Sequence, residues 1–357
     1  MIKLLIVDDS ALMRRQLTLL FQAEGDFTLF QARNGREAVA ANKEFQPDVV
    51  TLDINMPEMD GITALSLLMA ERPVPVVMVS SLTEKGALAT FEALNLGAVD
   101  YITKPGGTIS LSIDEIKEDL VGKVRAAAKA RLKGRGSAIK GLAQRLREDR
   151  AATPPPPVAI RRGMGGEGLV IIGVSTGGPR TLEDILPLLP AHSPWPVLVV
   201  QHMPAAFTRS FAERLDQICA MKVVETAGPM PVEPGTIYIA KGGADMILAR
   251  RSGKLTVLPK PENAQFLWHP SVDCLGQTVL ECCDPARVIA ILLTGMGHDG
   301  ADSFAEIRKR GGRTIAESEE SSVVFGMPAE LIKRGGATVV LPSTKVAAQV
   351  NAWVGLS

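Results

Sequence analysis

The first third of the chain alternates short continuous apolar runs with segments whose apolar residues recur at helical spacing. The runs are KLLIVDD, TLF, DVVTLD, VPVVMVSS and VDYITKP, and helical segments such as SALMRRQLTLLFQAEG and GITALSLLMAERP lie between them. Strands that helices cover on both faces are apolar at successive positions, because neither face meets water. The pattern therefore predicts an α/β domain built on a parallel sheet.

A second region with the same alternation begins at GLVIIGVSTGGP and extends to the end of the chain. Its further apolar runs are PVLVVQHMP, KVVETA, GTIYIA, KLTVLPK, RVIAILLTGMGHDG, GRTIAE and ATVVLP. Helical segments such as PAAFTRSFAERLDQIC separate them, so we expect a second, doubly wound sheet built from these runs. The fold class predicted for the whole chain is α/β with two domains.

The two patterned regions are separated by a segment of different composition. Residues 113–150 are rich in Lys, Arg, Ala and Glu, and ATPPPPVAIRRGMGGEG follows them. Consecutive prolines favour an extended chain without amide donors, and glycines favour flexibility, which is typical of a linker. We therefore expect a first domain at 1–122, a helical and Pro/Gly-rich linker at 123–166 and a second domain at 167–357.

Charge gives no global reason for binding nucleic acid or an anionic membrane, since Lys plus Arg and Asp plus Glu both number 39. A local basic cluster lacks interleaved aromatic residues, so a solvated helix face is favoured over a nucleic-acid patch; it comprises Lys123, Arg125, Lys129, Arg131, Lys133 and Arg135. The opening MIKLLIVDDS is too short for a signal peptide or a spanning helix. We expect a cytoplasmic protein with no nucleic-acid partner and no direct membrane insertion.

Polar residues close several runs of the first region. Asp8 and Asp9 end the first, Asp53 the third, Ser80 the fourth, and Lys104 follows the fifth. The carboxyl ends of parallel strands converge, and three crowded carboxylates suit a hard cation such as Mg²⁺. Asp53 is then the candidate phosphoryl acceptor, Lys104 neutralises phosphoryl charge, and the Ser80 hydroxyl can bond to the new group. Helix capping would explain any one of the aspartates, but not the set.

These motifs, DD, LDINMP, SS and KP in that order, resemble the receiver domain of bacterial response regulators. The resemblance implies a flavodoxin-like fold and phosphorylation of Asp53 by a partner histidine kinase. It also implies that Asp8, Asp9, Asp53 and the backbone carbonyl of Asn55 hold Mg²⁺. Tyr101 would be the aromatic switch residue.

The second region carries a candidate nucleophile, base and orienting acid. Ser175 lies in GVSTG directly after an apolar run and matches the G-x-S-x-G pattern, although a serine there can also cap a helix. His202 follows PVLVV and Asp299 follows IAILLTG, so all three come just after expected strands. A neutral imidazole can accept the serine proton, and a carboxylate can fix its tautomer.

The remaining histidines are placed less clearly by the sequence. His192 lies in an expected loop, His298 is expected to face away from the site or to line its rim, and His269 is ambiguous. The order Ser, His, Asp differs from that of α/β-hydrolases, so this would be a separate arrangement of the same roles.

The motifs STGGP, VVQHMP, FTRSFAERL, PSVD, LLTGMGxDG and SSVVFGMP, in this order, are similar to the catalytic domain of the CheB chemotaxis methylesterases. The likeness implies a Rossmann-like domain with Ser175, His202 and Asp299 as its triad. Thr176 would line the site, and the turn around Met296 would form the oxyanion hole. It further implies cofactor-free hydrolysis of glutamyl methyl esters, with glutamine deamidation, on chemoreceptor cytoplasmic helices.

Two segments depart from the pattern expected of that family. Trp268 and His269 precede Pro270 where an arginine is expected, and Lys241 and Asp245 stand where a proline and a histidine are common. The residues around the substrate therefore differ, while the proposed triad does not. The same esterase chemistry could serve a receptor-like pathway other than chemotaxis.

Two other classes of output domain are alternatives for the second region. A nucleotide-binding Rossmann unit also has a strand, a glycine turn and a helix, but GVSTGGP lacks the G-x-G-x-x-G spacing. A DNA-binding output would need a compact helix-turn-helix, whereas this half is rich in strands. The receptor, the kinase, the balance of the two activities, the extent of activation by phosphorylation and the oligomeric state are left open by the sequence.

Overall fold

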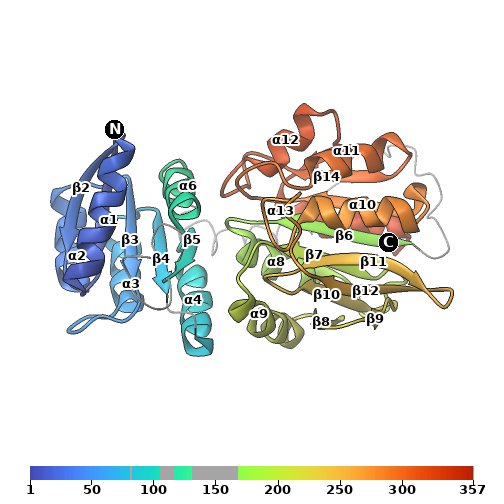
Figure 1. Cartoon of the computed structure of the whole chain (residues 1–357), viewed down its shortest axis with the longest axis horizontal. Helices are drawn as coiled ribbons and strands as arrows, with labels where there is room; N and C mark the ends of the chain where they lie inside the picture. Colours follow the sequence, from blue (N-terminus) through green and yellow to red (C-terminus); the bar gives the residue numbers. More distant parts are fainter. Residues whose placement is uncertain (81–82, 105–115, 131–167, 357) are drawn as a thin grey trace, which may run out of the picture.

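The computed structural model describes residues 1–80, 83–104, 116–130 and 168–356, and they form two α/β units (Figure 1). The first unit carries a five-stranded parallel sheet of order β2-β1-β3-β4-β5. This is the flavodoxin-like order, in which β1 and β3 flank the switch point where ligands bind. The predicted fold of the first domain is therefore confirmed.

The elements of this unit, with their bounds, are β1 (Ile2–Val7), α1 (Ala11–Glu24), β2 (Phe27–Ala32), α2 (Gly35–Glu44), β3 (Val49–Asp53), α3 (Gly61–Glu71), β4 (Val76–Ser80), α4 (Glu84–Leu96), β5 (Asp100–Thr103) and α6 (Lys117–Ala128). Local sequence accounts for where its helices begin. Each of α1 to α4 follows a residue whose side chain accepts a hydrogen bond from the helix backbone, namely Ser10, Asn34, Asp60 and Thr83.

Helix α6 crosses the boundary that the sequence suggested at residue 122. Its residues Leu120, Val121, Val124 and Ala127 are buried in one core cluster with residues of β1 and β4. Because burial of one helix face holds the whole helix on the sheet, the residues up to 128 belong to the first unit. The expected boundary thus falls inside a packed helix, and 131–166 of the expected linker lies outside the described residues.

The expectation of a solvated basic face on this helix was wrong for Lys123, whereas the Arg125 side chain is partly exposed. Lys123 Nζ lies 3.2 Å from Asp119 and 4.0 Å from Asp100, and only 16% of the Lys123 side chain is exposed. Arg125 pairs with Asp26 at 2.8 Å. The ion pairs of Lys123 and Arg125 help to hold α6 in place, and the spacing of basic residues in the sequence does not reveal these partners. Arg131, Lys133 and Arg135 lie outside the described residues.

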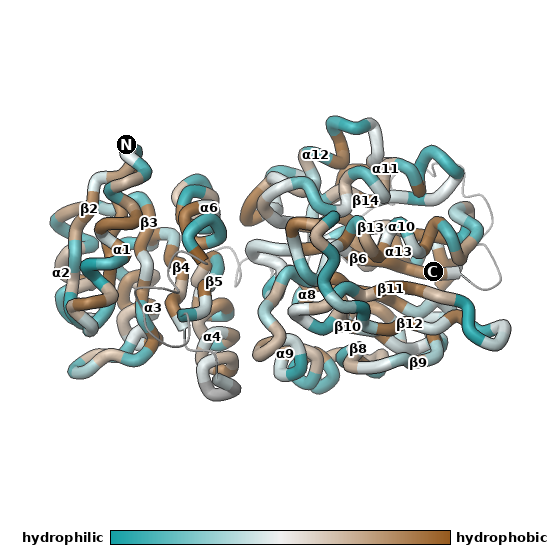
Figure 2. Tube along the Cα trace, in the orientation of Figure 1, coloured by the Kyte–Doolittle hydropathy of each residue, from teal (hydrophilic) through white to brown (hydrophobic). Residues whose placement is uncertain are grey.

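The second unit is built on a seven-stranded parallel sheet of order β15-β14-β13-β6-β7-β10-β8. Its bounds are β6 (Leu169–Val174), α8 (Gly178–Ile185), η2 (Leu186–Leu188), β7 (Val197–Gln201), α9 (Ala205–Ile218), β8 (Lys222–Thr226), β9 (Met230–Pro231), β10 (Thr236–Ala240), β11 (Asp245–Arg251), β12 (Lys254–Lys260), α10 (Val272–Cys282), η3 (Pro285–Arg287), β13 (Val288–Leu292), α11 (Ala301–Lys309), β14 (Arg313–Glu317), α12 (Met327–Lys333), β15 (Val339–Leu341) and α13 (Ser343–Val354). The central strands form an apolar layer between helices (Figure 2). The doubly wound prediction is confirmed for this sheet.

One run was assigned to the wrong sheet. KLTVLPK is β12, which pairs antiparallel with β11 and β9 in a separate three-stranded sheet. A two-residue turn joins β11 to β12, and its residues Ser252 and Gly253 have φ of 50° and 81°. Such left-handed turns match the twist of a hairpin, so adjacent strands pair locally instead of entering the parallel sheet.

The two units contact each other through α4, β5 and α6 of the first unit and α8 and α9 of the second (Figure 1). The Tyr101 ring stacks on Phe207 with centroids 4.9 Å apart, and Phe91 stacks on Phe211 at 5.5 Å. Aromatic pairs of this kind add to the free energy of burial, so the contact is apolar at its centre. Across the described ranges, the helices are all too short or too polar to cross a bilayer.

Candidate active site

Ser175 lies at the carboxyl edge of the second sheet, immediately after β6. Its N–H donates to the Thr294 carbonyl at 3.0 Å, and its own carbonyl accepts from Gln201 Nε2 at 3.0 Å. Helix α8 begins three residues later, with Gly177 at its N-cap at a φ of 78°. Ser175 therefore does not cap this helix, which leaves its hydroxyl available for chemistry.

His202 follows the neighbouring strand at the same edge. Val174 of β6 is paired with Gln201 of β7, so Ser175 and His202 are the next residues on strands about 4.8 Å apart. The His202 Nε2 atom lies 2.8 Å from Asp299 Oδ2, and the two side chains are 10% and 3% exposed. The structure thus brings all three predicted residues to the ends of β6, β7 and β13.

The orientation of the His202 ring determines which nitrogen can act as a base. Nε2 faces the Asp299 carboxylate, whereas Nδ1 is buried and has no hydrogen-bond partner. A carboxylate acceptor favours the tautomer with hydrogen on the facing nitrogen, so Nδ1 carries the free lone pair. This is the reverse of the arrangement in which the carboxylate binds Nδ1.

Asp299 is held as an anion by the start of α10. Its oxygens accept from the N–H groups of Val272 at 2.7 Å and Asp273 at 2.9 Å, and from Ser271 Oγ at 3.0 Å. Burial alone would raise the pKa of Asp299, but the His202 contact and these amides outweigh it and keep the pKa below its usual value. Sequence reasoning did not identify Ser271, although it lies in the quoted PSVD motif.

The turn expected to bind the oxyanion comprises Gly295, Met296 and Gly297. The Gly295 N–H donates to the Val324 carbonyl at 3.0 Å, so it is already used. Within the described part of the chain, the N–H groups of Met296 and Gly297 meet no backbone or side-chain acceptor. Gly297 has a φ of 84°, a conformation that favours glycine. Only the last two amides of this turn remain as candidate donors.

The first unit contacts both residues expected to line this site. Thr176 is buried, and its hydroxyl donates to Asp100 Oδ2 of β5 at 2.6 Å. A Cβ built on Gly122 of α6 would lie 2.9 Å from Met296 Cε, so that helix packs directly on the turn. Burial raises the pKa of Asp100 against the opposing effects of Lys123 and Thr176. The candidate catalytic site and the first unit are therefore physically connected.

Of the residues at which the sequence departs from the expected pattern, Trp268 lies against the candidate base. The Trp268 ring lies parallel to His202, and the exposed His298 meets the edge of that indole, so His298 lines the rim. His269 Nδ1 lies 3.1 Å from Asp245 Oδ1, forming a second histidine–carboxylate pair. His192 is exposed in a turn, as the sequence suggested. Lys241 is exposed as well.

The acidic residues of the first unit also converge. One carboxylate oxygen from each of Asp8, Asp9 and Asp53 lies within 4.8 Å of the others. Lys104 Nζ lies 3.0 Å from Asp8 and 2.8 Å from Asp53. Burial raises the pKa of Asp53 despite Lys104, while the two carboxylates raise the pKa of Lys104 against the lowering effect of its own burial. Three carboxylates facing one ammonium have the excess negative charge and the oxygen atoms that suit a divalent cation.

The three other residues expected in this region have different surroundings. The Ser80 hydroxyl is buried and donates to the Gly86 carbonyl at 3.2 Å. Tyr101 is buried against the second unit, and its hydroxyl has no hydrogen-bond partner. Burial, followed by the charge of Asp100, raises the pKa of Tyr101 well above its usual value. Asn55 is exposed after β3, and its backbone N–H bonds to the Asp53 carboxylate.

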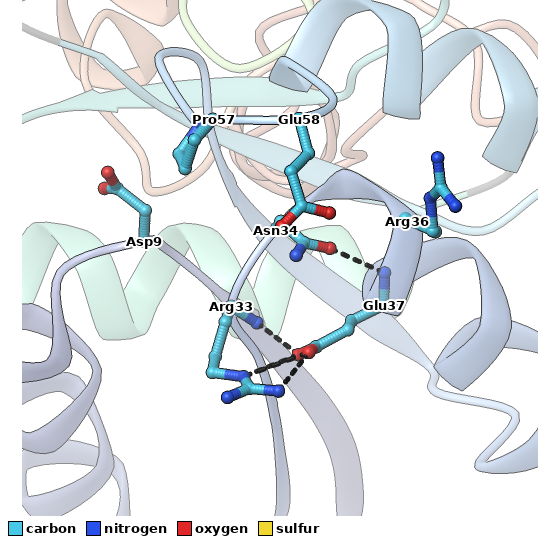
Figure 3. Close-up of a pocket in the computed structure, with 7 residues that line it drawn as sticks. All are labelled: Asp9, Arg33, Asn34, Arg36, Glu37, Pro57 and Glu58. Atoms are coloured by element: carbon cyan, nitrogen blue, oxygen red, sulfur yellow. Dashed lines mark hydrogen bonds and ion pairs between the residues drawn. The ribbon is translucent and has the colours of Figure 1, made fainter.

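An open pocket borders Asp9 (Figure 3). Its other lining residues come from the loops after β2 and β3 and from the start of α2, and are Arg33, Asn34, Arg36, Glu37, Pro57 and Glu58. The Arg33 guanidinium is bound by Glu37 at 2.6 Å, as Figure 3 shows, so its charge is directed away from Asp9. The acidic cluster is therefore reached from an open side of the sheet edge.

Comparison with known proteins identifies two matching family models. Residues 170–350 match the CheB methylesterase model, and residues 4–113 match the response regulator receiver domain model. A Rhodospirillum rubrum protein named protein-glutamate methylesterase/protein-glutamine glutaminase 3 is 54% identical, with 99% of this chain and 96% of that protein covered. A Caldanaerobacter subterraneus protein named protein-glutamate methylesterase/protein-glutamine glutaminase is 49% identical, with 97% and 94% covered.

A solved structure resembles the second unit. The Thermotoga maritima CheB methylesterase catalytic domain has a TM-score of 0.50 and 39% sequence identity. The match covers 52% of this chain and 97% of that domain. The second unit therefore has the fold of that domain over almost its full length.

Proposed function

Because this chain belongs to the CheB methylesterase family, we propose that it hydrolyses glutamyl methyl esters and deamidates glutamines on chemoreceptor helices under control of phosphorylation at Asp53. The observation that carries the chemistry is the 2.8 Å contact of His202 Nε2 with Asp299 beside Ser175. The test is release of methanol from a methylated chemoreceptor cytoplasmic fragment, with and without a small phosphodonor and Mg²⁺. Release that increases with phosphodonor supports the ester hydrolysis and its control by phosphorylation.

In the proposed reaction, Ser175 Oγ attacks the γ-carbonyl carbon of the ester while His202 Nδ1 takes the hydroxyl proton. The carbonyl oxygen becomes an oxyanion, for which the N–H groups of Thr176, Met296 and Gly297 are the candidate donors. The C–OCH₃ bond then breaks, and the proton on His202 passes to the leaving oxygen to give methanol. Asp299 stabilises the imidazolium that exists between these steps.

The second half of the reaction regenerates Ser175. Water gives one proton to His202 Nδ1, attacks the acyl carbon and displaces Ser175 Oγ, which recovers the proton. A glutamine side chain follows the same path with ammonia in place of methanol. One site therefore accounts for both activities in the names of the relatives.

Two other output functions are not favoured by this geometry. A phosphate-binding turn presents free backbone N–H groups at a helix N-terminus. Here the N–H of Ser175 donates to Thr294, and that of Gly178 donates to the Ser175 carbonyl. A DNA-binding output is equally disfavoured, because the described part of this unit is a seven-stranded sheet and a three-stranded sheet with flanking helices.

Regulation is proposed to act through the contacts between the two units. The Asp100–Thr176 hydrogen bond and the packing of α6 on Met296 fall on the residues assigned to the oxyanion site. Tyr101, next to Asp100, is stacked against Phe207. Phosphorylation of Asp53 by a histidine kinase would shift the equilibrium away from this closed arrangement, since Lys104 and Ser80 would bind the new phosphoryl oxygens.

A substitution on α6 can separate closure from phosphorylation. Replacing Gly122 by leucine places a side chain against Met296 while favouring the helix itself. A shift of about 1 kcal/mol toward the open form raises the ratio of open to closed molecules about fivefold. We expect the unphosphorylated Gly122→Leu variant to release methanol about five times faster than the wild type, with a smaller further response to phosphodonor.

The matched control is Glu118→Leu, which adds the same side chain one turn away at an exposed position of α6. It should leave the unphosphorylated rate unchanged. Asp53→Asn should abolish the response to phosphodonor in the wild-type background. Equal rates for the Gly122 and Glu118 variants would contradict closure by α6.

Mg²⁺ is the metal that the acidic cluster fits, and Asp8, Asp9, Asp53 and the Asn55 carbonyl would hold it. Bound there, it would neutralise phosphoryl charge. Mg²⁺ at about one hundred times its Kd should add about 2.7 kcal/mol to the free energy of unfolding. Thermal or urea unfolding with and without Mg²⁺ measures this gain, which Asp8→Asn should largely remove.

The pH dependence of this stabilisation follows from Asp53. A carboxyl group with a raised folded-state pKa stabilises the fold below its unfolded pKa, and this contribution is lost as pH rises through the folded pKa. Mg²⁺ binds the ionised form and offsets that loss. The Mg²⁺-dependent gain should therefore decrease as pH falls from neutrality toward the raised pKa of Asp53. A gain that is constant over this range would argue against Asp53 as a ligand.

A further inference from the structure

The indole of Trp268 covers the face of the proposed base. The Trp268 and His202 rings are nearly parallel, with an interplanar angle of 6° and centroids 5.5 Å apart. The edge of the imidazole is held by Asp299 at 2.8 Å. The Asp299 contact thus fixes the edge of the imidazole, and the Trp268 stack limits the tilt of the imidazole.

The same indole reaches the turn that carries the candidate oxyanion donors. A Cβ on Gly297 would lie 2.8 Å from Trp268 Cζ2 and 3.0 Å from Cη2, so the ring rests directly on that glycine. His298 approaches the indole edge-on, with centroids 5.5 Å apart and an angle of 86°. Trp268 therefore connects the base to the turn across the rim of the site.

The segment that carries Trp268 is anchored by other residues. Asp245 accepts from the Ser271 N–H at 2.9 Å and pairs with His269 Nδ1 at 3.1 Å, and the His269 carbonyl accepts from the Gly243 N–H. Ser271 in turn donates to Asp299. Because these bonds do not involve the indole, a change at Trp268 can alter the stack without releasing the segment.

We infer that Trp268 is a positioning residue that acts through His202, an inference that rests on the proposed function only in taking His202 as the base. Its π face holds the imidazole in line with Ser175 and stabilises the imidazolium that forms when Ser175 gives up its proton. That charge exists only on the way to and from the tetrahedral intermediate. The interaction therefore affects kcat more than KM.

The test compares Trp268→Phe, which retains a π face, with Trp268→Leu, which retains apolar bulk without one. The control is Leu267→Ala, a change at an adjacent, 78% exposed residue. We expect kcat for methanol release to fall about tenfold in the leucine variant and less than about threefold in the phenylalanine variant, with KM within about twofold in both. Leu267→Ala should match the wild type.

A second readout does not depend on the physiological ester. An alkyl fluorophosphonate labels a base-activated serine: Ser175 Oγ bonds to phosphorus, fluoride leaves with the bonding pair, and His202 takes the proton. The labelling rate should follow the same order, with Trp268→Leu about tenfold below the wild type and Trp268→Phe within about threefold of it. Circular dichroism and phosphorylation at Asp53 verify that each variant is folded.

Equal labelling rates in the leucine and phenylalanine variants would overturn the inference, as would a loss confined to KM. If the wild type is labelled at Ser175 but releases no methanol from methylated receptors, the proposed substrate is wrong, while the comparison of labelling rates still decides the role of Trp268. An absence of labelling in the wild type would remove the Ser175–His202 pair and this inference with it.

Discussion

Replacement of Ser175 by alanine should lower kcat for methanol release by at least about 10⁴-fold, since the remaining groups can only assist attack by water. Phosphorylation at Asp53 should be unaffected, because the two sites lie in different units (Figure 1). The measurement is methanol release from a methylated chemoreceptor fragment together with phosphate incorporation from a small phosphodonor. Both can be made on the same preparation.

Ser193→Ala is the matched control for this substitution. Ser193 is buried in the same unit, where its hydroxyl donates to the Trp195 carbonyl. The Ser193→Ala variant should therefore retain wild-type turnover. Turnover by Ser175→Ala within about tenfold of the wild type would remove Ser175 as the nucleophile. The esterase would then need a different attacking group.

Replacement of Asp299 by asparagine should lower kcat by about 10³- to 10⁴-fold. An amide nitrogen facing His202 Nε2 would donate to it and so move the ring hydrogen to Nδ1, the atom needed to accept the proton of Ser175. The amide also cannot stabilise an imidazolium as a carboxylate does. Steady-state methanol release and fluorophosphonate labelling should both fall.

Ionisation of Asp299 should add no pH dependence to this loss around neutral pH. The pKa of Asp299 lies below its usual value, so the wild-type carboxylate is ionised throughout the neutral range. A depressed pKa contributes stability above the unfolded pKa, and that contribution disappears as pH falls through the folded value. The ratio of wild-type to variant kcat should therefore be constant around neutral pH. Asp302→Asn, at a surface ion pair with Arg334, is the control and should retain activity.

Periodicity and motif order alone predicted both parallel sheets and the location of the candidate residues. Continuous apolar runs occur because the strands are covered on both faces, and a polar residue directly after such a run lies at the carboxyl edge of its sheet. Ser175 and His202 follow β6 and β7 at once, so the strand pairing was sufficient to bring them together. The same reasoning applies to Asp8 and Asp53 at the switch point of the first sheet.

Tertiary structure decided what depends on contacts between distant residues. The antiparallel place of β12 follows from its hairpin with β11, and the role of Lys123 follows from Asp100 and Asp119. The choice of His202 Nδ1 as the proposed base follows from the side on which Asp299 lies. Neither the pattern of charges nor the spacing of residues in the sequence predicts these three outcomes.

The sequence by itself determined the two α/β domains and the edge of each sheet at which the candidate residues lie, because local burial and chain order are sufficient for these. Only the tertiary structure placed Asp100 against Thr176, 76 residues away, and laid Trp268 over His202. Such contacts join residues that are far apart in the chain, and the local sequence around each residue gives no sign of its partner. For this reason the candidate site could be predicted from sequence, while its connection to the receiver domain could not.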